Sequence, residues 1–310
     1  GPGCSEKGMR MIVSLRKYIP ILLVMLIWGS MGIPSTYAVA EFSPMTVLCL
    51  RSGIAALFLF PVAQKHRCAI RPVLADTLLL VVLSMIGVFA CNYFYYYAVQ
   101  NTSLTHVAVL YALGPIITTV LASVFLNETI HGGRLLGIVI AFLGVALLIT
   151  GGRISDFLRD GFHTGDAAEL MSALCLAVYT ILSRRLKGIS SECVSFWLML
   201  ICFVVTLPLV LLTGGFPEDV SMRGIASVCY LGIACSGLGY LLQQASIRYI
   251  GASASAAFLN GISPITIVTA ALVLKEQISV LQILCMGLIF IGLFLNAENA
   301  HIAVHTGKQG

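Results

Sequence analysis

Apolar stretches about as long as a bilayer is thick recur along the whole chain, with short polar connections between them. Ten stretches follow this pattern, at residues 17–39, 44–62, 74–98, 102–124, 132–150, 165–185, 193–213, 223–246, 251–273 and 278–296. About 20 apolar residues in a helix cross the hydrocarbon core of a membrane. The pattern therefore predicts an all-α membrane protein with ten transmembrane helices, most of them joined as hairpins.

The first apolar stretch also has the features of a secretory signal peptide. The segment MRMIVSLRKYIPILLVMLIWGSMGIPSTYAVA has a basic start, an apolar run and an Ala-Val-Ala ending. We favour a transmembrane helix, because the apolar run is long enough to cross the membrane without further residues. The internal repeat described below also requires a helix at this position. Residues 1–12 are expected to form a flexible tail, in which Gly1-Pro2 is typical of a scar left by tag cleavage.

Composition supports the membrane class. Of the 310 residues, 59% are hydrophobic and 10% are charged, which is too little charge to cover a soluble domain of this length. The net charge of +5 is spread over loops and indicates no nucleic-acid partner. The ten cysteines form no C-x-x-C pair, so neither a disulfide framework nor a zinc site is expected.

Lysine and arginine are distributed unequally between the two sides of the predicted helices. With the N-terminus in the cytoplasm, 13 of them fall on the cytoplasmic side and 4 outside, while Arg51 lies inside a span. The four outer residues are Arg153, Arg159, Arg223 and Lys275. We therefore predict a multi-pass protein of the cell inner membrane with both termini in the cytoplasm.

The two halves of the chain are similar to each other. TSLTHVAVLYALGPIITTVLASVFLNETI (102–130) aligns with GASASAAFLNGISPITIVTAALVLKEQI (251–278) at an offset of 149, which matches Pro115 with Pro264. Pro61 matches Pro208 at an offset of 147. Five helices per half is an odd number, so the second half enters the membrane from the opposite side. Many secondary transporters use such inverted repeats to open one central site to alternate sides.

The polar segment GGRISDFLRDGFHTG is the longest connection and marks the boundary between the halves. We predict a first five-helix repeat at residues 13–152, an extracytoplasmic linker at 153–163 and a second five-helix repeat at 164–297. Residues 298–310 are expected to form a cytoplasmic tail.

Several blocks of the sequence carry a family resemblance. LIWGSMGIPSTYAVAEFSPMTVLCLRSGIAALFLF has a Trp-Gly, a Ser-Pro and an Arg within the second helix, and YAVQNTSLTHVAVLYALGPIITTVLASVFLNETI precedes a Gly-rich helix. GASASAAFLNGISPITIVTAALVLKEQISVLQILCMGLIFIGLFL repeats the latter pattern. Residues 17–297 thus resemble the EamA-type transporters of the bacterial drug/metabolite superfamily. The resemblance implies a ten-helix carrier of small metabolites, often an exporter.

The chain departs from that family at two places in the sixth predicted helix. Glu169 stands where an apolar residue is usual, and Cys175-Leu176 stands where an aromatic residue is common. Glu169 is either an exposed residue near the interface or, if it reaches a cavity, a carrier of a coupling proton or a partner for a cationic substrate.

Two further ionisable residues lie within predicted spans. Arg51 is either a structural residue bonded to backbone carbonyls or a contact for an anionic group of the substrate. His106 is either an interhelical hydrogen-bond partner or a proton carrier. It matches Ser255 of the second half, as Tyr111 matches Asn260. Five residues apart means about 140° around a helix, so His106 and Tyr111 cannot both face one cavity centre.

Aromatic and neutral polar residues supply the candidate binding groups. In CNYFYYYAVQ, part of the tyrosine cluster is expected to form an interfacial belt, and Tyr93, Tyr96 and Tyr97 share a helix face from which Tyr95 points away. The candidates for substrate binding are Trp28, Ser35, Asn92, Tyr93, Tyr96, Tyr111, Tyr179, Tyr240, Gln243 and Asn260. The stripe of Trp28, Gly32 and Ser35 also fits plain helix packing. Pro115 and Pro264 are expected to bend their helices, either for packing alone or around a central cavity.

These observations predict a secondary active transporter for amino acids or related amphipathic metabolites, with a cavity between the first, third, fourth, sixth, eighth and ninth helices. No phosphate-binding loop of the G-x-x-x-x-G-K-[ST] type and no lysine deep in a span is present, which argues against ATP drive and phosphorylated substrates. A channel is one alternative. A lipid-modifying enzyme is another, although His163 and Asp166 offer no nucleophile or metal-ligand set. We expect no cofactor and no metal, with a small-molecule substrate, the bilayer and proton coupling as the interactions of a monomer or homodimer.

Overall fold

The computed structural model describes residues 17–66, 68, 74–102, 104–126, 132–153, 155, 159, 161–186, 188–217, 219–265, 268 and 279–306. These residues form helices and contain no β-strand. The first repeat contains α2 (Ile19–Gly29), α3 (Gly32–Glu41), α4 (Pro44–Lys65), α5 (Leu74–Leu83), η1 (Ser84–Ala90), α6 (Cys91–Asn101), α7 (Leu104–Tyr111), α8 (Gly114–Phe125) and α9 (Gly132–Thr150). The second contains α11 (Thr164–Ser183), α12 (Ser191–Leu212), α13 (Met222–Tyr230), η2 (Leu231–Gly239), α14 (Tyr240–Ile250), α15 (Ala252–Phe258), η3 (Leu259–Gly261) and α17 (Val280–Thr306).

Five helices within the described residues are long and apolar enough to cross a membrane, namely 44–65, 76–101, 164–183, 191–212 and 222–250. A sixth span results if α2 and α3, which meet at a bend of 45°, are counted as one. The apolar helices at 109–125, 135–150 and 280–295 are shorter. The all-α membrane class is confirmed, whereas the count of ten spans stays a prediction.

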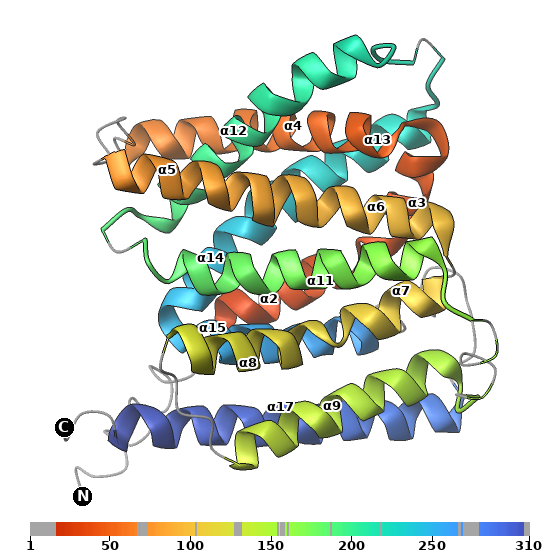
Figure 1. Ribbon diagram of the computed structural model, residues 1–310, viewed down its shortest axis with the longest axis vertical. Coiled ribbons are helices and arrows are strands. Elements are labelled where there is room, and N and C mark those ends of the chain that lie inside the picture. Colours follow the sequence, from red (N-terminus) through yellow and green to blue (C-terminus); the bar gives the residue numbers. More distant parts are fainter. Residues whose placement is uncertain are drawn as a thin grey trace, which may run out of the picture.

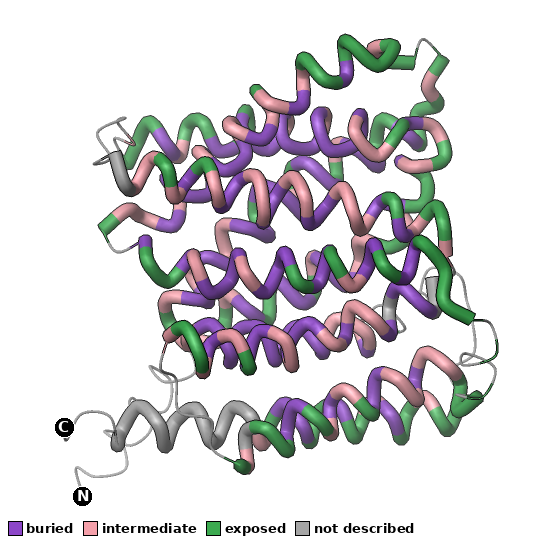
Figure 2. The backbone as a smooth tube through the Cα atoms, viewed as in Figure 1, coloured by how far each residue is buried: buried purple, intermediate pink, exposed green. Residues whose placement is uncertain are grey.

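Local sequence signals explain where several helices begin. Ser43, Ser190 and Ser221 each precede a helix in extended conformation, and their hydroxyls accept a hydrogen bond from the backbone N–H three residues later. Apolar side chains such as Leu57 and Leu212 are exposed, and exposed residues recur along the outer helices of the bundle (Figure 2). A surface of this kind is stable in lipid, because apolar side chains that contact lipid tails do not pay the free-energy cost of contact with water.

The helices lie roughly side by side in one bundle (Figure 1). α4 packs on α12, α9 on α17 and α8 on α15, so three helices of the first repeat contact their counterparts in the second. The other two contacts are crossed, because α2 packs on α14 and α6 packs on α11. A twofold relation between the repeats produces this pairing, which agrees with the internal similarity of the sequence.

The third helix of each repeat contains a π-helical segment at the same position. η1 covers residues 84–90 and η2 covers residues 231–239, and their starts are related by the offset of 147 seen in the sequence. π-Helical turns often occur at functional sites because they shift the register of side chains and carbonyl groups. Gly87 in η1 permits close packing, since a Cβ there would lie 2.1 Å from Cδ2 of Tyr179.

Regular α-helix is interrupted near both matched prolines, while the bends themselves stay a prediction. α7 ends at Tyr111, and α8 begins at Gly114 with Pro115 in its first turn. In the second repeat, the short 3-10 segment η3 separates α15 from the residues around Pro264, which is buried.

One disulfide departs from the sequence analysis. Cys68 and Cys193 are joined, with 5.3 Å between their Cα atoms, and link the residues after α4 to the first turn of α12. The expectation of no disulfide framework was made from spacing alone, which does not report that α4 and α12 are packed side by side. Seven other cysteines, among them Cys91, Cys175 and Cys202, are free thiols, and six of the seven are buried.

Candidate functional site

Arg51 is the centre of a buried polar network between the two repeats. Its side chain is 2% exposed. Nε donates to Oγ of Ser236 at 2.6 Å, and Nη1 donates to Oδ1 of Asn92 and to the hydroxyl of Tyr96, each at 2.7 Å. No carboxylate of the described residues forms an ion pair with it. A buried guanidinium held only by neutral groups keeps its positive charge available to an anionic ligand.

The π-helical segment η1 helps to position this network. The amide of Asn92 donates to the carbonyl of Val88 at 2.7 Å and to the hydroxyl of Tyr240 at 2.9 Å. That hydroxyl donates in turn to the carbonyl of Gly87 at 2.8 Å. α6 and α14 are therefore joined through carbonyl groups of η1, and the amide of Asn92 is oriented with its oxygen toward Arg51.

A small cavity lies beside the network. It is lined by Trp28, Met31, Arg51, Cys91, Asn92, Tyr95, Tyr111, Ser172, Leu176 and Tyr240, which come from both repeats. Its volume is about 40 Å³. Pockets that hold small molecules typically measure about 300–1,000 Å³. The side chains therefore nearly fill the site in this conformation, and a metabolite needs the surrounding helices to move apart.

Five of the ten candidates for substrate binding belong to this cavity or its network. The cavity is lined by four of them, Trp28, Asn92, Tyr111 and Tyr240. The fifth, Tyr96, does not line the cavity but accepts a hydrogen bond from Arg51. Trp28 is fixed by a hydrogen bond of 3.1 Å from Nε1 to the carbonyl of Cys235 and by edge contact with the Tyr240 ring.

The structure decides between the two candidates on the fourth helix. Tyr111 lines the cavity, whereas His106 is directed at Asp166 and is absent from the cavity lining. On the third helix, Tyr95 lines the cavity although helical spacing suggested that it points elsewhere. Tyr93 is instead half-buried and stacked on Phe89. The helical wheel sorted the tyrosines by face but did not show which face of α6 is turned toward the cavity.

The remaining candidates are buried outside the cavity. Ser35 lies beside Tyr95 and Tyr96. The hydroxyl of Tyr179 accepts a hydrogen bond of 2.7 Å from Gln244, and Gln243 accepts one of 3.4 Å from Ser255. Asn260 in η3 is buried, and its amide has no hydrogen-bond partner within the described part of the chain. These residues surround the site more widely and do not form its wall.

Glu169 of α11 is completely buried, so it is not the exposed interfacial residue that was one of its two interpretations. Neither carboxyl oxygen has a hydrogen-bond partner among the residues that the structure describes. It lies near Cys91, Tyr95 and Tyr111, all of which line the cavity. A carboxyl group in this position can exchange a proton or pair with a cationic group of a ligand.

Sequence reasoning missed several members of the site. Ser236, which accepts the shortest hydrogen bond from Arg51, lies in the apolar run IACSGLG of η2, where a serine is usually a packing residue. Cys91 and Ser172 are neighbours in the cavity wall, and the hydroxyl of Ser172 donates a hydrogen bond to the backbone carbonyl of Cys91 at 2.9 Å. No spacing signal distinguished these small residues from ordinary helix packing.

A second polar cluster lies at the N-terminal end of α11, where the linker between the repeats enters this helix. Nδ1 of His106 is 2.9 Å from Oδ1 of Asp166, and Nδ1 of His163 is 3.5 Å from Oδ2. Thr102 donates to Oδ1 of Asp166 at 2.7 Å, and the backbone N–H of His163 donates to Oδ2 at 2.7 Å. Among the described residues, these two histidines and the aspartate are the group with the donor set for a metal ion.

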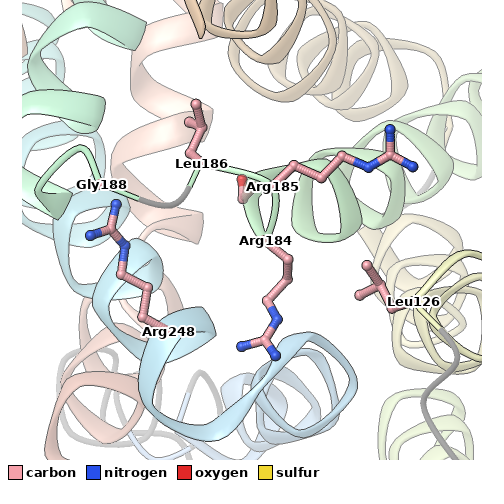
Figure 3. A pocket seen from close by; sticks show the side chains of 7 residues that line it. Leu126, Arg184, Arg185, Leu186, Gly188 and Arg248 are labelled. Atoms are coloured by element: carbon pink, nitrogen blue, oxygen red, sulfur yellow. The ribbon is translucent and has the colours of Figure 1, made fainter.

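A third, more open pocket of about 450 Å³ lies where α8, α11 and α14 end. Its lining includes Arg184, Arg185 and Arg248, and Figure 3 shows that Arg184 and Arg185 point to different sides of the pocket. Arg184 donates to the carbonyl of Ile247 at 3.0 Å, and Arg248 donates to the carbonyl of Ile189. Arginines at these positions stabilise helix C-termini and concentrate positive charge at one end of the bundle. This basic pocket is separate from the buried cavity.

Comparison with known proteins identifies relatives across nearly the whole chain. The profile of the "EamA-like transporter family" matches residues 15–150 and 163–297. "Uncharacterized transporter YyaM" of Bacillus subtilis is 26% identical, with 95% of this chain and 98% of that protein aligned. An "Uncharacterized transporter" of Archaeoglobus fulgidus is 25% identical over 91% of this chain and 98% of its own length.

A more distant relative carries a substrate in its name. "Probable terminal-alkyne amino-acid exporter" of Streptantibioticus cattleyicolor is 24% identical, with 54% of this chain and 56% of that protein aligned. A solved crystal structure superimposes with a TM-score of 0.78 at 16% identity, covering 92% of this chain and 98% of the other. This similarity shows that the two proteins share a fold.

Proposed function

The chain belongs to the EamA-like transporter family, and from this premise we propose that it is a secondary active transporter that exports amino acids or related amphipathic metabolites. The chain belongs to a transporter family, its relatives are named transporters, and it has several apolar helices. It is therefore a multi-pass membrane transporter. The substrate class, the direction of transport and the mechanism are the proposal.

The observation that carries the proposal is the unneutralised Arg51 in a cavity shared by both repeats. Arg51 comes from α4, while Ser236 and Tyr240 around it come from η2 and α14 of the other repeat. A site at the interface between repeats opens to one side or the other when the repeats rock against each other. The position of this cavity supports alternating access.

The charges beside the cavity favour a zwitterionic ligand. Arg51 offers bidentate hydrogen bonds to a carboxylate. Glu169 is a buried carboxyl group that lies near Tyr95 and Tyr111 of the cavity wall. An amino acid presents a carboxylate and an ammonium group to these two residues, and the tyrosine rings suit its apolar or cationic side chain. The name of the Streptantibioticus relative is consistent with this class.

The small volume of the cavity also supports a carrier. With about 40 Å³ and side chains from several helices around it, the site has no room for a metabolite in this conformation. A carrier passes between a form open to one side of the membrane and a form open to the other, and a site without room for substrate is expected between them.

The test is transport by purified protein in proteoliposomes. We expect an unlabelled amino acid inside the vesicles to accelerate entry of its labelled form, with saturation as the outside concentration rises. Flux that is linear in concentration and unaffected by counter-substrate would favour a channel instead. Conversion of labelled lipid by the same vesicles, without amino-acid exchange, would favour an enzyme.

A thermal-shift screen chooses the amino acid before flux is measured. A ligand that binds only the folded state raises the apparent melting temperature by mass action, by an amount that grows with its concentration. Stabilisation by amines or nucleosides and by no amino acid would contradict the proposed substrate class while leaving transport itself intact.

A further inference from the structure

We propose that His106, His163 and Asp166 form a binding site for one Zn²⁺ ion, or a similar divalent transition-metal ion, at the end of the bundle where the linker enters α11. None of the three residues lines the buried cavity. The site is therefore separate from the substrate cavity proposed above, although its consequence for transport rests on that proposal.

The distances between the three side chains agree with a metal site. Zn²⁺ is bound at about 2.0–2.2 Å by imidazole nitrogen and carboxylate oxygen, so two ligand atoms of one tetrahedron lie about 3.3 Å apart. The Nδ1 atom of His106 is 2.9 Å from Asp166, and that of His163 is 3.5 Å from it. The candidate ligand atoms of all three residues lie within 4.8 Å of one another. Both histidine–aspartate separations are thus within about 0.4 Å of the spacing expected for two ligands of one ion.

The donor types select the class of metal. Two imidazoles and one carboxylate suit Zn²⁺ and its first-row neighbours, whereas Ca²⁺ and Mg²⁺ prefer oxygen ligands. Three protein ligands leave the fourth tetrahedral position to water. An ion can reach the site from solvent beside His163, whose side chain is 44% exposed. The side chains of His106 and Asp166 are 4% and 1% exposed.

The surroundings hold the carboxylate in place before any ion binds. Thr102 donates to one oxygen of Asp166, and the backbone N–H of His163 donates to the other. Outer hydrogen bonds of this kind orient ligands and contribute to metal affinity. Asp166 also closes a capping box with His163 at the start of α11, so the ligand position is fixed by the helix terminus itself.

The location gives the site a structural consequence. His106 belongs to α7 in the first repeat, and Asp166 belongs to α11 in the second. An ion bound by both joins the two repeats at one end of the bundle. Alternating access requires the repeats to separate at that end, so Zn²⁺ bound there is expected to hold the carrier closed on this side.

The test measures metal binding directly on the full-length protein. The chain is purified without a polyhistidine tag, treated with chelator and titrated with Zn²⁺ against a chromophoric competitor. We expect about one strong site per chain in the wild type. His163→Ala should weaken that site by at least about tenfold, since loss of even an outer-shell partner costs about 10–100-fold.

Three comparisons complete the experiment. Replacement of His163 leaves the core intact because the side chain is largely exposed, and His66→Ala, an exposed histidine elsewhere, serves as the matched control with unchanged affinity. Asp166→Asn, nearly equal in shape, should also lose the strong site. Equal Zn²⁺ affinity of wild type and His163→Ala, or no strong site in the wild type, would show that the cluster is a hydrogen-bonded contact between α7 and α11 only.

Discussion

At the scale of single residues, the chemistry of the cavity depends on how Arg51 is held. Its guanidinium is bonded to Ser236, Asn92 and Tyr96, three groups that are neutral at physiological pH. A buried cation with such partners is costly in a membrane and is usually retained for a function. Its partners are side chains, whereas the purely structural interpretation expected backbone carbonyls, and we propose that Arg51 contacts the ligand.

Tyr96 offers a direct test of this network. Its side chain is completely buried, so Tyr96→Ala should reduce transport but also leave a cavity in the core. Tyr96→Phe removes only the hydroxyl that accepts from Arg51. A hydrogen bond to a charged group is worth about 1.5–3 kcal/mol, so we expect KM for the substrate to rise by roughly tenfold or more in proteoliposomes. Tyr97→Phe, at the exposed neighbouring residue, should behave as wild type.

Unchanged kinetics in Tyr96→Phe would mean that the hydroxyl contributes nothing to substrate binding. In that case Asn92 and Ser236 would suffice to position Arg51, and Tyr96 would be a packing residue.

Glu169 is the residue that we expect to couple transport to protons. Glu169→Gln keeps the size of the side chain and removes its ability to exchange a proton. We predict that this variant loses transport driven by a pH gradient and retains exchange of substrate against substrate. Asp76→Asn, at a carboxylate in the first turn of α5, is the control. Equal acceleration by a pH gradient in Glu169→Gln and wild type would exclude this role.

At the scale of secondary-structure elements, close approach of η1 to α11 positions the two halves of the site. The Tyr179 ring rests directly on Gly87, whose carbonyl accepts the hydrogen bond from Tyr240. The π-helical segment therefore serves two purposes, because it brings α11 near the backbone and presents a carbonyl group to α14.

Gly87→Ala tests this packing. The added methyl group would overlap the Tyr179 ring, and overpacking of this kind typically costs about 1–3 kcal/mol. We expect the melting temperature in detergent to fall by about 3 °C or more. Gly32→Ala is the matched control, because a methyl group on Gly32 in α3 meets no atom within 4 Å. A melting temperature equal to that of the control would show that η1 and α11 separate freely.

At the scale of the whole molecule, the arrangement of charges relates the fold to its membrane. The C-terminal ends of α4, α11 and α14 lie at the same end of the bundle (Figure 1), and they carry Lys65, Arg184 and Arg248. By the positive-inside rule, we propose that this end of the bundle lies in the cytoplasm. The Cys68–Cys193 disulfide lies at this end too. Because cytoplasmic thiols are kept reduced, we expect the pair to be two thiols in growing cells.

Orientation can be measured by cysteine labelling in intact cells. Arg153→Cys, in the exposed start of the linker, should react with a membrane-impermeant maleimide from outside. Lys65→Cys, exposed at the end of α4, should react only after the membrane is permeabilised. The reverse pattern would place the N-terminus outside the cell and overturn the assignment made from lysine and arginine.

The sequence by itself determined the class and the plan of the molecule. The long apolar stretches predicted membrane helices, and matched positions such as Pro115 and Pro264 predicted two repeats with a break in each. These features depend on local composition and periodicity, which a linear reading records. For the same reason, the polar positions of the third, fourth and eighth helices could be identified as candidates before their partners were known.

Only the tertiary structure decided which candidates meet. Tyr111 rather than His106 lines the cavity, Tyr95 replaces Tyr93, and Ser236 joins Arg51 from 185 residues away. The tertiary structure also brought His106 to Asp166, and Cys68 to Cys193. Each outcome depends on how far a helix is rotated about its axis and on which helix packs against it. Side chains of two repeats set these rotations together, so no single segment of the sequence contains them.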